Sequence, residues 1–222
     1  MNPPKIITFC SAAWLVVSSA QAQATFQNLN FELGSPGSEN YAFNVPVANA
    51  LPFWTVYYGD VQQTQVDYNV VTSGTSIVSL IGGTYLPAID GNYSVYLEEG
   101  VSASSVSISQ TGLIPLGMQS LLFEADSGPG TLGISIGSQN IPFTEVGTGA
   151  NYTLYGANIS AWSGDTEQLT FTALQGGGLN DWLLDDISFS TNVVASPEPN
   201  IAALSAIGGL LFGARKWFAR RS

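Results

Sequence analysis

The chain has 222 residues, which predicts one domain or at most two, and it carries 16 acidic and 5 basic side chains for a formal net charge of -11. It has one cysteine and no histidine, which excludes a disulfide framework, imidazole-based acid–base catalysis and a zinc site built from Cys or His. Charged residues make up 9% of the sequence, against roughly 25% in an ordinary soluble domain.

Residues 1–22 have the pattern of a secretory signal peptide. Lys5 supplies the positive charge near the start, residues 6–20 form an apolar run, and Ala20-Gln21-Ala22 gives the small-x-small pattern of a cleavage site. The alternative is a first transmembrane helix, but this apolar run is short for a span and a polar segment follows it directly. We therefore predict an exported protein.

Residues 23–193 form the body of the protein, and their pattern is that of short strands separated by Gly-rich turns. No stretch of the body shows sustained helical periodicity, and several stretches alternate between apolar and polar residues. The predicted strands lie near residues 26–33, 53–58, 64–71, 76–81, 92–98, 104–110, 119–125, 131–136, 151–159, 167–174 and 182–190. The fold class is therefore all-β, as an antiparallel, two-sheet, jelly-roll-like β-sandwich.

The five basic residues all lie near the two ends of the chain, and no Lys or Arg occurs between residues 6 and 214. The body is therefore a polyanion at neutral pH, which excludes nucleic-acid binding, because that needs a basic surface. Two interpretations stay open: calcium binding, because hard cations prefer oxygen ligands, and solubility through like-charge repulsion, which needs no ligand.

Acidic residues beside core aromatics mark both ends of the body. Glu32 follows Phe31 near the start, and Asp185 and Asp186 precede Ile187 near the end. If the first and last strands pair, Glu32 and Asp186 approach one another on one face with no base between them. A proton or a cation would relieve their repulsion, and calcium is the most suitable cation.

The Asn-x-Phe-Glu opening and the Asp-Asp-Ile-x-Phe ending resemble the ends of galactose-binding-like jelly-roll domains and related carbohydrate-binding modules. The resemblance implies a structural calcium ion, with Glu32 and either Asp185 or Asp186 as ligands, and sugar binding elsewhere, on a concave sheet or at loop tips. The alternative is that these residues are solvent-facing acids beside core aromatics.

Aromatic side chains are the candidate sugar-binding groups, because sugar faces stack on exposed rings. The richest segment is Trp54-Thr55-Val56-Tyr57-Tyr58, so we predict Trp54, Tyr57 and Tyr58 as ligand-binding residues. Most aromatic side chains of a sandwich lie in its core, and burial is therefore the alternative for each of them.

Catalysis would have to rely on carboxylates, because no histidine or lysine of the body can activate a nucleophile. Glu98 and Glu99 are adjacent in a predicted strand, so they face opposite sides of the sheet and cannot act as a pair. Glu124 and Asp126 share a face but lead directly into a Gly-Pro-Gly turn. We therefore assign no catalytic residue and expect no enzyme, with a glycoside hydrolase as the less favoured alternative.

Residues 194–222 form a tail with three parts: a Pro-Glu-Pro motif, an apolar segment over residues 201–214, and a basic end. Prolines stop the preceding strand, a short apolar helix can enter a bilayer, and the basic end would stay on the cytoplasmic side. The residues that carry this pattern are Pro197, Glu198, Pro199, Arg215, Lys216, Arg220 and Arg221. A plain C-terminal membrane anchor is the alternative, although the segment is short for a permanent span.

This tail resembles the PEP-CTERM sorting signal of exopolysaccharide-producing bacteria. The resemblance implies an exosortase-type sorting protease as partner, transient insertion into the inner membrane, and a final location at the cell surface or in the extracellular matrix. We therefore expect a secreted, surface-sorted, non-enzymatic protein of the cell envelope or exopolysaccharide matrix, structural or adhesive. The alternative is a calcium-stabilised carbohydrate-binding module, with exopolysaccharide or another glycan as ligand.

Overall fold

The computed structural model describes residues 24–72, 74–100, 105–128, 130–174 and 180–194. The predicted signal peptide and all of the predicted tail after residue 194 lie outside these residues, and so do the seven residues of the sorting motif. Within the described residues, no helix has the length and apolar character needed to cross a membrane.

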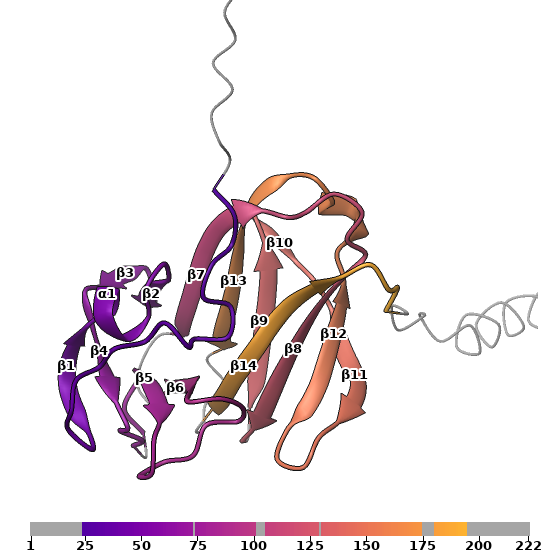
Figure 1. The fold of residues 1–222 in the computed structure, drawn as a ribbon. Helices are drawn as coiled ribbons and strands as arrows, with labels where there is room; N and C mark the ends of the chain where they lie inside the picture. Colours follow the sequence, from indigo (N-terminus) through magenta and orange to yellow (C-terminus); the bar gives the residue numbers. More distant parts are fainter. Residues whose placement is uncertain (1–23, 73, 101–104, 129, 175–179, 195–222) are drawn as a thin grey trace, which may run out of the picture.

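The body is a sandwich of two sheets, which confirms the predicted all-β fold class (Figure 1). The larger sheet contains, in spatial order, β1 (Ala42–Pro46), β4 (Gln65–Tyr68), β5 (Ile77–Gly82), β6 (Tyr93–Glu99), β14 (Asn180–Ser190), β8 (Ser120–Ser127), β12 (Thr153–Asn158) and β11 (Phe143–Thr148). The smaller sheet contains β10 (Gln139–Asn140), β9 (Thr131–Ile136), β13 (Thr166–Leu174), β7 (Val106–Leu113), β2 (Thr55–Tyr58) and β3 (Val61–Gln63). Short helical turns are α1 (Val47–Ala50) and η1 (Ser160–Trp162).

The strands of the larger sheet run from the N-terminal elements on the left of Figure 1 to β11 and β12 on the right. Strands β4 and β5 are parallel, whereas the other paired strands in the described residues are antiparallel. Strand β14 pairs with β6 on one side and β8 on the other. The last strand of the body therefore lies in the middle of the larger sheet, where it is covered by neighbours along both edges.

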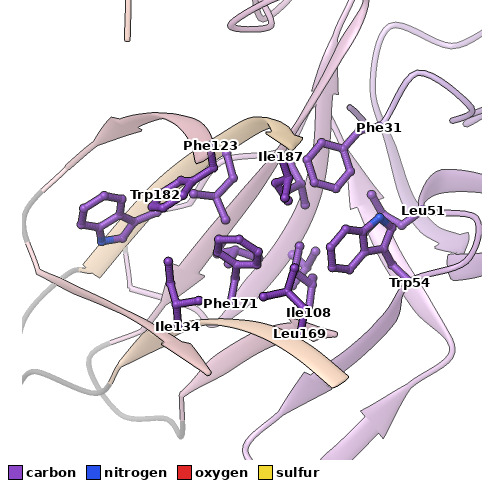
Figure 2. Close-up of a cluster of buried hydrophobic side chains, with 14 of the residues drawn as sticks. Phe31, Leu51, Trp54, Ile108, Phe123, Ile134, Leu169, Phe171, Trp182 and Ile187 are labelled. Atoms are coloured by element: carbon purple, nitrogen blue, oxygen red, sulfur yellow. The ribbon is translucent and has the colours of Figure 1, made fainter. Parts of the chain in front are cut away.

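Apolar side chains of both sheets meet in one core (Figure 2). Strand β13 shows why the pattern folds this way, because every second side chain points inward: Leu169, Phe171 and Ala173 are all buried. Phe171 packs edge-on against Phe123 of the opposite sheet, with 5.4 Å between ring centroids. Burial of these aliphatic and aromatic side chains is the main favourable contribution to the free energy that holds the two sheets together.

Residues 26–33 do not form the predicted strand. Asn28 and Phe31 both have positive φ angles, 51° and 59°, so the chain turns twice where an extended backbone was expected. The turn is stable because the Asn28 side chain accepts the N–H of Leu33 at 2.9 Å, as asparagine often does in turns. Phe31 is fully buried, while Leu33 is 56% exposed, so the predicted alternation fails as well.

The two ends of the body do meet, as predicted, but they do not meet through pairing of the first and last strands. The N–H of Ile187 in β14 donates to the carbonyl oxygen of Leu29 at 3.0 Å. Phe26 also packs against Phe189, with 5.2 Å between ring centroids. The N-terminal segment therefore lies against β14 as a turn and not as a paired strand.

Strands β1, β3, β10 and β11 were not predicted; β1 and β11 are the edge strands of the larger sheet, and β3 and β10 are those of the smaller sheet. Asn44 has a positive φ angle within β1, and the pairing of β1 with β4 is irregular between Ala42 and Val45. The pairing of β11 with β12 shifts register between Glu145 and Gly147. Such irregularities are typical of sheet edges, and they break the alternation by which a strand is recognised in a sequence.

Glu99 is a buried acid at the inner face of the sandwich. It is 1% exposed and stands opposite Asn180, which is fully buried, in the β6–β14 pairing. The Glu99 Oε2 atom and the Asn180 Oδ1 atom have no hydrogen-bond partner among the described residues. Two residues at paired positions therefore each bury an acceptor that has no donor among the described residues, which is costly in a low-dielectric interior.

We predict that Glu99→Gln stabilises the protein by about 1 kcal/mol, because the new amide can donate to Asn180 Oδ1. Urea denaturation at neutral pH would measure the change, and Glu145→Gln, on the exposed edge strand β11, is the matched control with no expected effect. A loss of stability in Glu99→Gln would show that the carboxylate has a partner that favours its charge.

Candidate functional site

Acidic side chains gather on the outer face of the larger sheet, where β6, β14 and β8 lie side by side. Leu183 of β14 stands opposite Tyr96 of β6 and Asp126 of β8. In the neighbouring row, Asp181 stands opposite Glu98. These residues alternate along their strands with the core residues, so they project from the opposite face of the sheet.

A pocket of about 360 Å³ lies over this face and is called the acidic pocket below. Its polar lining is formed by Tyr96, Asp126 and Asp181. Its apolar lining comes from Val71, Ile81, Leu86, Pro87 and Leu183. Gly128 allows the Asp181 carboxylate to lie where it does, because a Cβ atom at Gly128 would collide with the carboxylate oxygens.

A second hollow of about 490 Å³ adjoins the acidic pocket and shares Val71 and Leu86 with it. Tyr41, Phe43 and Tyr85 line this hollow and are called the aromatic patch; each of the three is more than half exposed. The Tyr41 ring centroid is 6.1 Å from that of Phe43 and 6.3 Å from that of Tyr85. Pocket and patch together form one surface with an apolar, aromatic part and a carboxylate part.

Glu98 lies beneath the acidic pocket and is 1% exposed. Its Oε1 atom accepts the Thr72 hydroxyl and the Gly74 N–H, each at 3.0 Å. Its Oε2 atom accepts the Thr72 N–H at 3.1 Å and lies 3.3 Å from the Tyr96 hydroxyl. The two backbone N–H groups are donors for Glu98 alone, whereas the Thr72 hydroxyl also lies 3.1 Å from the Thr75 carbonyl oxygen, so Glu98 is a buried acid held mainly by backbone donors.

Tyr96 joins Glu98 to the pocket, because its hydroxyl oxygen is also 3.3 Å from Asp181 Oδ2. Burial raises the pKa of Asp181, and the charges of Glu98 and Asp126 raise it further, although the hydrogen bond with Tyr96 opposes them. Burial raises the pKa of Tyr96 far above its ordinary value, and the charges of Asp181 and Glu98 add to this increase. The pocket therefore favours protonated groups in the absence of a cation.

Glu32, the first predicted calcium ligand, holds the turn before β6. Its carboxylate accepts the N–H and the side-chain amide of Asn92, both at 2.7 Å, and the N–H of Tyr93 at 2.9 Å. Burial opposes ionisation of Glu32, but these hydrogen bonds outweigh it and lower its pKa. Gly91 has a φ angle of +58°, and a Cβ atom there would collide with the Glu32 carboxylate.

Asp185, the second predicted ligand, is 1% exposed and connects β14 to β6. Its Oδ2 atom accepts the Ser94 hydroxyl at 2.7 Å and the Asp90 N–H at 3.3 Å, and its Oδ1 atom accepts the Asp186 N–H at 2.8 Å. Burial raises the pKa of Asp185 to about 7, although these hydrogen bonds act in the opposite direction. The charge of Asp186 contributes to the increase.

Asp186, the third predicted ligand, interrupts β14 with a positive φ angle of 43°. Burial and the charges of Asp90 and Glu32 raise its pKa, so the acids from the two ends of the body do interact. Within the described residues, however, no three acidic side chains are arranged as a ready metal site. Since Glu32 and Asp185 each already accept three hydrogen bonds, a cation would have to share their oxygens with these donors.

The three predicted ligand-binding aromatics lie away from the aromatic patch. Trp54 is 4% exposed, its ring is 5.6 Å from that of Phe31, and its Nε1–H donates to the Asn28 carbonyl oxygen at 2.9 Å, so its ring is not free to stack on a sugar. Tyr57 and Tyr58 are half-buried in β2 of the smaller sheet, and the Tyr58 hydroxyl accepts the Val78 N–H at 3.0 Å. Tyr41 and Phe43 of the aromatic patch are not among the ligand-binding residues predicted from the sequence.

No protein-family model matches this chain, and no curated protein sequence matches it. The solved structures that resemble it include a cyclase from Fischerella sp. TAU in complex with 4-(1H-indol-3-yl)butan-2-one, at 12% identity and a TM-score of 0.48, covering 79% of this chain and 100% of the cyclase chain. An exo-β-agarase matches at 10% identity and a TM-score of 0.38, over 72% of this chain and 26% of its own. A sialidase matches at 11% identity and a TM-score of 0.30, over 66% of this chain and 22% of its own. Likeness this distant carries no functional argument, so the function must be inferred from the site itself.

Asp185 makes stability depend on pH. A carboxyl with a raised pKa binds its proton more tightly in the folded than in the unfolded chain, so the free energy of unfolding falls as pH rises from 3.8 to about 7. We predict that Asp185→Asn removes on the order of 2 kcal/mol of this fall. Urea denaturation across this pH range would measure it, with the exposed Asp60→Asn as the matched control.

The remaining slope in Asp185→Asn would come from Glu124, Asp181 and Asp186, whose pKa values are raised as well. A wild-type stability that rises between pH 4 and pH 7 would contradict the prediction.

Proposed function

We propose that this protein is exported, sorted to the cell surface, and acts there as a non-enzymatic adhesive protein that binds a glycan. The observation that carries the proposal is the exposed aromatic patch directly beside a pocket lined by carboxylates. Sugars have apolar faces that stack on aromatic rings and hydroxyl groups that donate to carboxylates. The surface offers both kinds of contact within one continuous hollow.

The exposure of the patch supports a binding role. Tyr41 is 54% exposed, Phe43 61% and Tyr85 58%, and the neighbouring Val71 is 51% exposed. Apolar residues that gather on the surface of a soluble domain often mark a place where a partner binds. A tyrosine-rich surface also keeps polar hydroxyl groups available, which suits a partner that is itself partly polar.

Export and sorting rest on the terminal segments. The signal-peptide pattern of residues 1–22 and the tail of residues 194–222 support delivery through the inner membrane, with an exosortase-type protease as the processing partner. The final location in this proposal is the cell surface or the extracellular matrix, where an adhesive domain would meet exopolysaccharide.

We also propose calcium as a structural ligand of the cluster formed by Glu32, Asp90, Asp185 and Asp186. The charges of Asp90 and Glu32 raise the pKa of Asp186, which indicates repulsion that a cation would relieve. We expect calcium at about 100 times its Kd to raise Tm by roughly 5–10 °C relative to chelator. Asp186→Asn should remove the increase and the exposed Glu39→Gln should keep it, and equal melting with calcium and chelator would contradict the proposal.

The glycan site can be tested by isothermal titration of the purified protein with the exopolysaccharide of the producing cells. We predict that Tyr85→Ala and Phe43→Ala each weaken binding about tenfold, because each removes a stacking surface worth about 1–1.5 kcal/mol. Tyr57→Ala, in the other sheet, is the matched aromatic control and should bind normally. Unchanged binding in both patch variants, or loss of binding in Tyr57→Ala alone, would contradict a site at the aromatic patch. It would favour the segment Trp54-Thr55-Val56-Tyr57-Tyr58 that the sequence predicts.

An incubation of the purified protein with the same polysaccharide tests the absence of catalysis. The proposal expects no increase in reducing ends when the protein is incubated with the polysaccharide, because binding leaves the glycosidic bonds intact. Release of oligosaccharides that stops in Asp126→Asn would instead make the protein a glycoside hydrolase.

A further inference from the structure

No basic side chain lines the acidic pocket among the residues that the structure describes. The chain has no histidine, and no Lys or Arg lies between residues 6 and 214. Asp126 and Asp181 line the pocket and Glu98 lies beneath it, so three carboxyl groups share one region without a basic partner. Neighbouring carboxylates repel one another unless a proton or a cation lies between them.

The Tyr96 hydroxyl has fewer hydrogens to donate than it has carboxylate neighbours. Its hydroxyl oxygen is 3.3 Å from an oxygen of Glu98 and 3.3 Å from an oxygen of Asp181, but a hydroxyl has one hydrogen to donate. One of these two contacts therefore joins two acceptors, unless a carboxyl carries an extra proton. Since Glu98 also accepts the N–H groups of Thr72 and Gly74, Asp181 has fewer donors and is the better placed of the two carboxyl groups to carry a proton when no ligand is bound.

Building on the glycan-binding function proposed above, we infer that the ligand is an amine-bearing glycan. The ammonium group of an unacetylated amino sugar would enter the acidic pocket between Asp126 and Asp181, and a sugar ring of the same chain would stack on the aromatic patch. The ammonium replaces the proton of Asp181 and donates to the carboxylates that have no cation of their own.

The shape and lining of the pocket favour an organic ammonium over a bare metal ion. Val71, Leu86 and Leu183 form an apolar wall beside the two carboxylates, which suits the carbon ring that carries the amine. The tyrosine rings of the patch add a cation–π attraction for a nearby ammonium group. Acidic glycans, in contrast, would meet a surface with no base to pair with their carboxylates or sulfates.

Binding should tighten as pH rises, as long as the amine keeps its proton. Among the described residues, the titratable groups that face the site are Tyr96 and Glu98 from β6, Asp181 from β14 and Asp126 from β8, and Tyr41 and Tyr85 face the adjoining hollow. At acid pH, Asp181 holds the proton that the ammonium must displace. At higher pH, this competition disappears, and the pocket gains a full negative charge.

A matched pair of ligands tests the inference. Chitosan tetrasaccharide and the fully N-acetylated chitin tetrasaccharide share one backbone and differ in the free amine, so calorimetry of the full-length protein with both at about pH 6 isolates the ammonium contribution. We expect at least about tenfold tighter binding of the chitosan oligomer, and an affinity that falls toward pH 4.

Variants locate the amine within the protein. Asp181→Asn and Asp126→Asn keep the side-chain shape and remove one charge each, so each should weaken binding of the chitosan oligomer severalfold more than binding of the acetylated oligomer, which loses only a hydrogen-bond acceptor. Glu145→Gln removes the same charge from the exposed edge strand β11 and should keep the preference. Melting curves confirm folding of each variant, and Asp126→Asn, at an exposed position, serves if Asp181→Asn unfolds.

The outcomes separate this inference from the proposed function. Equal binding of the two oligomers, weakened by Tyr85→Ala, would overturn the amine preference and leave the glycan site in place. A chitosan preference that survives in both aspartate variants would assign it to the overall negative charge of the protein and overturn the inference. No binding of these oligomers or of the cells' exopolysaccharide would overturn the proposed function as well.

Discussion

The body of this protein folds with fifteen acidic side chains and no basic one, and this imbalance governs where each acid can lie. Ion pairs cannot form within such a domain, so a buried carboxylate must be balanced by neutral N–H and O–H donors, by a proton or by a cation. Glu32, Glu98 and Asp185 show the first solution, with three or more donors each. Asp185 also tends to bind a proton, because burial raises its pKa to about 7.

The two acidic regions of the larger sheet differ in what the surrounding chain offers them. Glu32 and Asp185 accept backbone N–H groups of the segment before β6, so their charges help to fix that segment against β14. Around Asp181 the donors are fewer, because its side chain shares the single hydroxyl hydrogen of Tyr96 with Glu98. The first region therefore stabilises the fold, whereas in the second the Asp181 carboxylate faces a pocket with fewer donors around it.

The sandwich places this pocket beside the aromatic patch through connections that are distant in the sequence. Tyr41 directly precedes β1 and Phe43 lies in it, Tyr85 belongs to the segment between β5 and β6, and Asp181 belongs to the last strand. They meet because β14 inserts between β6 and β8, while the residues before β6 fold back toward the outer face of the sheet. The site is hard to find in the sequence, because each segment of the chain contributes only one or two of its residues.

The alternation of apolar and polar residues determined most of the strands, because inward side chains must be apolar for the two sheets to pack. It failed at residues 26–33, where the side chain of Asn28 favours a turn, and at the irregular edge strands β1 and β11. The Tyr41-Ala42-Phe43 alternation was a usable signal for two exposed rings on one face, but one strand of such a pattern does not reveal which face is outside.

Composition alone also determined that the body must balance its acids without bases. Only the tertiary structure decided which acids are satisfied and which are not, because hydrogen-bond donors come from segments far apart in the chain. It likewise decided that Trp54 lies in the core and that Tyr41, Phe43 and Tyr85 lie outside. Burial depends on which sheet faces which, and that arrangement is a property of the whole packing and not of any local pattern.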